Sequence, residues 1–82
     1  MSKKIKLIWD FRGSASERTA QHHERHLKEY IISENLDGIV TGHSSYGEMH
    51  AIAFMVVPEA DMVRFRDALK PHRGEVYEPG NA

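Results

Sequence analysis

Histidine is the residue type in this chain that can take part in the widest range of chemistry. The 82 residues include six histidines and no cysteine. An imidazole can act as an acid, a base or a metal ligand near neutral pH, whereas disulfides, thiolate nucleophiles and thiolate metal sites are excluded. What each histidine can do depends on the element that carries it. The six are His22, His23, His26, His43, His50 and His72.

His22 and His26 are four residues apart in a segment with helical periodicity. This spacing places two imidazoles on one side of a helix, where they can chelate a metal ion. The glutamate of the zinc-protease motif is absent from its position, and a third ligand would have to come from elsewhere in the fold. The alternative is a solvated polar flank of the helix.

His23 lies between Ala20 and Leu27 on the apolar stripe of the same helix. A buried imidazole must find a hydrogen-bond partner or face a pocket. Two interpretations follow: a core histidine bonded to a backbone carbonyl or a tyrosine, or a base or ligand contact in a cleft.

His43 and His50 flank a turn at Tyr46-Gly47. A tight turn centred there predicts that the two histidines face each other on one side of the sheet. Two adjacent imidazoles suit the polar rim of a dimer interface or the mouth of a pocket.

Asp10 comes at the end of the first predicted strand, close to the start of the first helix. A carboxylate at such a junction can serve as a general base. Alternatively it caps the turn at Arg12-Gly13 or pairs with Arg12.

The elements that must position these residues follow from hydrophobic periodicity. Residues 5–11 alternate as a strand, and Ser14 with Glu17 predicts a capping box for a helix that reaches about Asn35. A hairpin of residues 39–45 and 49–58 follows. A second helix from Pro58 ends before Pro71 and leads to a strand at 75–77.

The order βαββαβ predicts one ferredoxin-like α+β domain over residues 1–82. Its four-stranded antiparallel sheet carries two helices on one face, with the first and third strands at the centre. The apolar run at residues 51–57 points to both faces, and two helices cover only one of them. We therefore expect a homodimer that forms through the open sheet face.

In this topology the chain resembles the small ferredoxin-like proteins of the dimeric α/β barrel group. The resemblance implies sheets that pack face to face in pairs. It also implies a pocket between sheet and helices, where members of that group include monooxygenases, isomerases and dehalogenases with a catalytic histidine or aspartate.

Charge and composition limit the classes of molecule that the chain is expected to bind. The formal net charge is -1, which disfavours nucleic acid and anionic membranes. With no apolar stretch of signal or transmembrane type, a cytoplasmic location is expected. A local basic cluster around the second helix suits a carboxylate or phosphate; it comprises Arg64, Arg66, Lys70, His72 and Arg73.

The leading hypothesis is a homodimer that binds a small, partly apolar ligand between the sheet and the first helix, without a cofactor. His23, His50, His43 and Asp10 are the predicted polar contacts. One alternative is a cofactor-free enzyme with His23 or Asp10 as base. Another is a structural or regulatory module similar to small-molecule-sensing domains of the same topology, with Arg12-Gly13 in the turn where those domains contact effectors.

Overall fold

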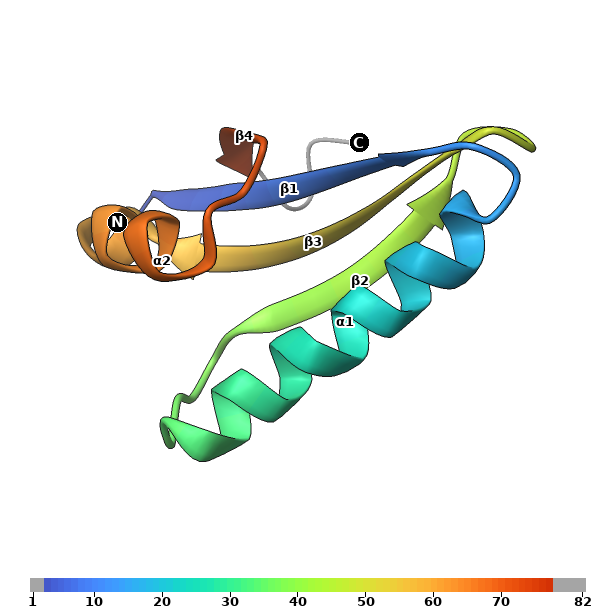
Figure 1. The fold of residues 1–82 in the computed structure, drawn as a ribbon. Helices are drawn as coiled ribbons and strands as arrows, with labels where there is room; N and C mark the ends of the chain where they lie inside the picture. Colours follow the sequence, from blue (N-terminus) through green and yellow to red (C-terminus); the bar gives the residue numbers. More distant parts are fainter. Residues whose placement is uncertain (1–2, 78–82) are drawn as a thin grey trace.

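The structure, a computed structural model, describes residues 3–77 and has the predicted βαββαβ order (Figure 1). A short 3₁₀ turn at Glu59–Asp61 separates β3 from α2. The second helix therefore begins at Met62, later than the predicted start at Pro58. The elements are β1 (Lys4–Arg12), α1 (Ser16–Ser33), β2 (Val40–Ser45), β3 (His50–Pro58), α2 (Met62–Leu69) and β4 (Arg73–Tyr77).

The four strands form one antiparallel sheet with the order β2-β3-β1-β4. Strands β1 and β3 lie side by side at its centre (Figure 1). The ferredoxin-like α+β fold and the central position of the first and third strands are confirmed. Strands β2 and β4 are the two edges.

Both helices pack on the same face of the sheet, as predicted. The alternation of β1 sends Leu7 and Trp9 toward the helices, where they meet Leu27 of α1 and Phe65 of α2. Full burial of a leucine or phenylalanine side chain contributes about 1.5 to 3 kcal/mol. The indole Nε1 of Trp9 also donates to the carbonyl of Leu69 at 3.1 Å, which ties β1 to the end of α2.

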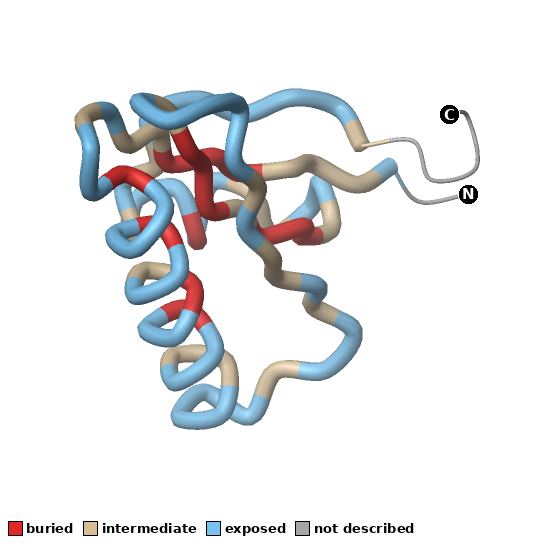
Figure 2. The backbone as a smooth tube through the Cα atoms, turned by 90° about the vertical axis from the view of Figure 1, so that its right-hand side faces the viewer, coloured by how far each residue is buried: buried red, intermediate tan, exposed pale blue. Residues whose placement is uncertain are grey.

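The first helix starts differently from the prediction. Ala15 is at the N-cap position and no side chain caps the helix, so the predicted capping box of Ser14 and Glu17 is wrong. Backbone hydrogen bonds of Gly13 fix the start of the helix in place of a capping box. With φ of 109°, Gly13 donates its amide to the carbonyl of Met49, and its carbonyl accepts from the amide of Ser16. The buried residues of α1 recur along one side of the helix (Figure 2).

The apolar run of β3 points to both faces, as expected. Ile8, Ile52 and Val56 belong to the open face, and each is only 1% exposed within the single chain. Their burial therefore does not by itself require a second copy. The homodimer stays a prediction.

The described residues contain no helix that combines the length and the apolar character needed to cross a membrane.

Gly42 and Phe54 form a packed pair on the open face, where β2 meets β3. A Cβ at Gly42 would clash with Cζ of Phe54, so the ring occupies the space above this glycine. The ammonium group of Lys6 lies 4.3 Å from the centre of the same ring. An aromatic ring that covers a strand glycine in this way shields exposed backbone.

We expect Gly42→Ala to displace the Phe54 ring and to lower the free energy of unfolding by about 1 to 2 kcal/mol. Urea denaturation measures the change. In a Phe54→Leu background the same substitution should cost much less, because the clash is gone. Equal costs in the two backgrounds would contradict the pairing.

Candidate functional site

The β2–β3 hairpin has a different register from the predicted one. His43 is opposite Ala53, and Tyr46 donates its amide to the carbonyl of His50 at 2.8 Å. The turn is therefore centred on Glu48, which shifts the pairing by three residues. Because an odd shift moves a side chain to the other face, the predicted pairing of His43 with His50 is wrong.

The four predicted ligand contacts consequently lie on both faces of the sheet. His23 and His43 lie on the side of α1, where they contact Trp9 and Glu24 respectively. Asp10 and His50 lie on the open face. These four residues therefore do not form a single pocket between the sheet and the first helix.

Asp10 is the centre of a polar cluster on the open face. Its Oδ1 accepts from Nε2 of His50 at 2.9 Å, and Arg73 donates from Nε to Oδ2 at 2.9 Å and from Nη2 to Oδ1 at 3.2 Å. We call Asp10, His50 and Arg73 the Asp10 cluster. It joins β1, β3 and β4, so three strands fix its geometry.

The Asp10 carboxylate is strongly held in its charged form. Hydrogen bonds from Arg73 lower the pKa of Asp10 to about 2; burial opposes them, and His50 adds to the lowering. The predicted partner Arg12 is not the one observed. Arg73 was expected only as part of a basic cluster that attracts a carboxylate, and in the fold it binds the chain's own Asp10.

His72 supports the same strand end through the backbone. Its Nδ1 accepts from the amide of Asp10 at 2.8 Å, and its own amide donates to the carbonyl of Ile8 at 2.9 Å. The imidazole thus extends the pairing of β1 with β4 and sets the position of Arg73, the next residue. This structural role was not foreseen from the sequence.

A second carboxylate–histidine pair connects α1 to β2. Oε1 of Glu24 lies 2.6 Å from Nδ1 of His43, and Thr41 donates to Oε2 at 3.2 Å. Burial raises the pKa of Glu24, but the hydrogen bonds from His43 and Thr41, with help from Lys28, outweigh it and lower the pKa. Sequence reasoning missed Glu24, although it lies four residues after Ala20 and three before Leu27 on the buried stripe.

His23 packs between aromatic rings. Its ring centre is 4.9 Å from that of Trp9 and 5.4 Å from that of Phe11. Its Nε2 is buried and has no hydrogen-bond partner among the described residues, so neither predicted partner is found for this atom. Burial chiefly lowers the pKa of His23, and the nearby His26, His72 and His22 lower it further.

His22 and His26 lie together, as their spacing predicts. Their ring centres are 4.5 Å apart, and both residues are exposed on α1. Within residues 3–77, no group of three or more histidine, aspartate, glutamate or cysteine side chains is arranged to hold a metal ion. A third ligand for this pair is not present in the described part of the chain.

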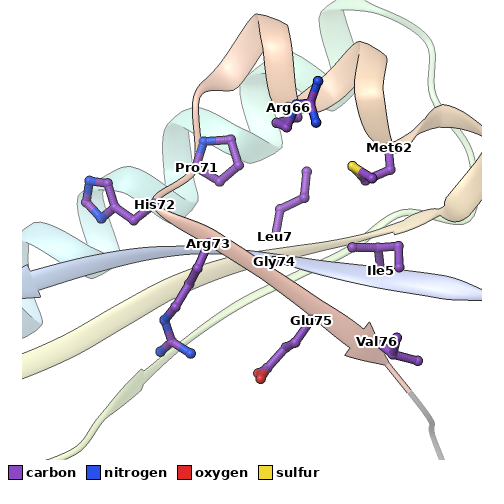
Figure 3. Close-up of a pocket in the computed structure, with 10 residues that line it drawn as sticks. All are labelled: Ile5, Leu7, Met62, Arg66, Pro71, His72, Arg73, Gly74, Glu75 and Val76. Carbon is purple, nitrogen blue, oxygen red and sulfur yellow. The ribbon is translucent and has the colours of Figure 1, made fainter.

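A groove of about 400 Å³ lies between α2 and β4 (Figure 3). Leu7 rises from β1 at its floor, and the side chains of Arg73 and Glu75 point away from it, to the other side of β4. The groove is therefore mainly apolar inside, with Arg66 above it on α2. The remaining residues around it are Ile5, Met62, Pro71, His72, Gly74 and Val76.

We expect Asp10→Asn to lower the free energy of unfolding at pH 7 by about 1 to 2 kcal/mol, once solvent screening at the half-exposed Arg73 is allowed for. The folded pKa lies below the usual value of 3.8. The stabilisation is thus present above about pH 4 and is lost as the pH falls toward 2. Urea denaturation across this range should show that the free energies of unfolding of the wild type and Asp10→Asn become equal at low pH. The exposed control Glu29→Gln should show no such convergence.

We expect His23→Leu to raise the free energy of unfolding by about 1 kcal/mol at pH 7.5, because it removes a buried, unpartnered nitrogen. Because the pKa of His23 is lowered in the folded state, the unfolded chain binds a proton at a higher pH than the folded chain does. The stability of the wild type therefore decreases as the pH is lowered past about 6.5, and the stability difference in favour of the variant increases. Denaturation at pH 7.5 and 5.5 measures both effects. A destabilised variant would show that the imidazole has a partner.

Comparison of the chain with protein-family models, curated proteins and solved structures finds no match. The function is therefore inferred from the geometry of the molecule.

Proposed function

We propose that this chain binds a small, partly apolar organic acid in the groove between α2 and β4. The observation that carries the proposal is the groove itself. Its volume of about 400 Å³ and its mainly apolar side chains are typical of sites for small molecules, which are concave and carry few polar groups. The proposal keeps the ligand class predicted from the sequence and moves its site from the first helix to the second.

The apolar part of the ligand would lie on Leu7, Ile5 and Met62. These side chains belong to the predicted apolar face of β1 and to the inner side of α2. Val76 is half exposed at the edge strand, with 50% of its surface open to solvent. A ligand that covers it would remove apolar surface from water, which is favourable by about 25 cal/mol per Å².

The acidic group of the ligand would bind Arg66. This side chain lines the groove and is 53% exposed. Its present partner is the neighbouring Asp67, through one bond of 3.3 Å. An exposed pair of this kind contributes little, so the guanidinium can take a ligand carboxylate through stronger paired bonds.

Gly74 offers a way to close the groove without moving the backbone. A Cβ built there would lie 3.6 Å from Cγ2 of Ile5 and from Cδ2 of Leu7, which is ordinary contact. A β-branched side chain at this position would therefore project among the groove residues. Strand residues with such side chains are also favoured over glycine.

We expect hexanoate and phenylacetate to bind the wild-type protein and to shift the backbone amide signals of Leu7 and Val76 in ¹H–¹⁵N spectra. Gly74→Val should weaken binding about tenfold or more, equivalent to about 1.4 kcal/mol, and keep the melting temperature. The matched control is Glu75→Thr, on the same strand with its side chain directed away. It should bind like the wild type.

A second variant in the same experiment tests the role of Arg66. Arg66→Gln should weaken hexanoate binding and leave hexanol binding unchanged, because only the carboxylate uses the guanidinium. If neither acid shifts the groove signals, or if Gly74→Val has no effect on binding, the groove is not the site.

A further inference from the structure

We propose that His50, held by Asp10 and accompanied by Arg73 and Tyr46, is a general base that removes a proton from a small carbonyl acid on the open face of the sheet. This is a second site, separate from the α2–β4 groove, and it does not depend on the proposed ligand there. Four side chains from β1, the β2–β3 connection, β3 and β4 meet at it.

The Asp10 cluster fixes which nitrogen of His50 carries the proton. An ionised carboxylate can only accept hydrogen bonds, and Asp10 stays ionised down to about pH 2. Nε2 of His50, at 2.9 Å from Oδ1, must therefore be the protonated nitrogen. Nδ1 is left with the lone pair in the neutral ring, and within residues 3–77 no hydrogen bond engages it.

Arg73 keeps donors for a second anion while it holds Asp10. A guanidinium has five N–H donors, and two of them point to the carboxylate, which leaves three. The side chain is 46% exposed. Its remaining N–H groups can bind the oxygen on which negative charge develops when a neighbouring proton is removed.

Tyr46 forms a wall beside the base. Its ring centre is 5.4 Å from that of His50, with an angle of 51° between the planes, and 60% of the residue is exposed. The pKa of Arg73 is raised chiefly by Asp10; burial opposes this, and the charges of Glu75 and Tyr46 add to the rise. His50 therefore has an aromatic wall beside its ring and the Arg73 guanidinium across the shared Asp10 carboxylate.

The arrangement suits proton abstraction better than acyl transfer. A base and an oxygen-binding cation are present, and no serine or cysteine is bonded to the base in the described chain. In the step, Nδ1 takes a proton from the carbon next to a carbonyl. The C–H electron pair forms the enolate, whose oxygen accepts from Arg73, and the imidazolium returns the proton to carbon. No oxidant, reductant or metal ion is consumed.

Pyruvate is the probe, because it carries a carboxylate, a carbonyl and exchangeable methyl protons. In D₂O at pH 7.5, the wild-type protein should exchange these protons at least about 100-fold faster than an equal concentration of free imidazole. ¹H NMR measures the loss of the methyl signal. His50→Gln should abolish the acceleration, and Arg73→Lys should lower kcat more than it raises KM, because the guanidinium binds the charge that develops on the oxygen.

The matched control is His43→Gln, which removes the histidine of the other carboxylate pair, on the opposite face of the sheet. It should keep the wild-type rate. Asp10 is a positioning residue, so Asp10→Asn should lower kcat and produce a mixture of His50 tautomers in ¹⁵N spectra. The tautomer reports the bond between Asp10 and His50, and the loss of kcat reports its role in the exchange; a merely structural role would leave kcat unchanged.

Two results would overturn the proposal. One is an exchange rate in the wild type that does not exceed the rate with free imidazole. The other comes from the unmutated protein alone and needs no folded variant: at pH 8, ¹⁵N spectra in which His50 carries its proton on Nδ1 would exclude Nδ1 as the base.

Discussion

The antiparallel register of β1 between β3 and β4 is the constraint on which the rest of the structure depends. It pairs Trp9 with Ala53 and Ile8 with Arg73, so every second side chain of β1 goes to the helices and the others go to the open face. The same register brings Asp10 to His50 and Arg73, which are 40 and 63 residues away in the sequence. One alternation thus builds both the core and the polar cluster.

Two carboxylate–histidine pairs occupy the two faces of this sheet, and they differ in what surrounds them. Glu24 is 9% exposed and bonds across from α1 to β2, where its role is to attach a helix to an edge strand. Asp10 bonds across three strands and has an arginine as a second partner. Removal of either carboxylate would leave polar groups with fewer partners. Each carboxylate also has a cation beside it: Lys28 lies 3.5 Å from Glu24, whereas Arg73 binds Asp10 through two hydrogen bonds.

The fold could be predicted from the sequence because its signals are local. The alternation of residues 5–11, the helical stripe containing Ala20 and Leu27, and the apolar run of β3 each depend on near neighbours in the chain. The Asp10 cluster could not be predicted, because it depends on the register between strands that are far apart in the sequence. A connection centred on Glu48 in place of the predicted turn at Tyr46-Gly47 separated His43 from His50, and the pairing of β4 with β1 that brings Arg73 to Asp10 has no local signal.

Trp9 is the chain's only tryptophan, and it is 3% exposed with its indole N–H bonded to Leu69. Leu69 ends α2, two residues before Pro71 on the side of the groove. The tryptophan fluorescence of the protein therefore originates from one indole in the core, and its emission depends on whether the end of α2 stays against β1. The chain carries a built-in optical reporter for the docking of its second helix, with no label required.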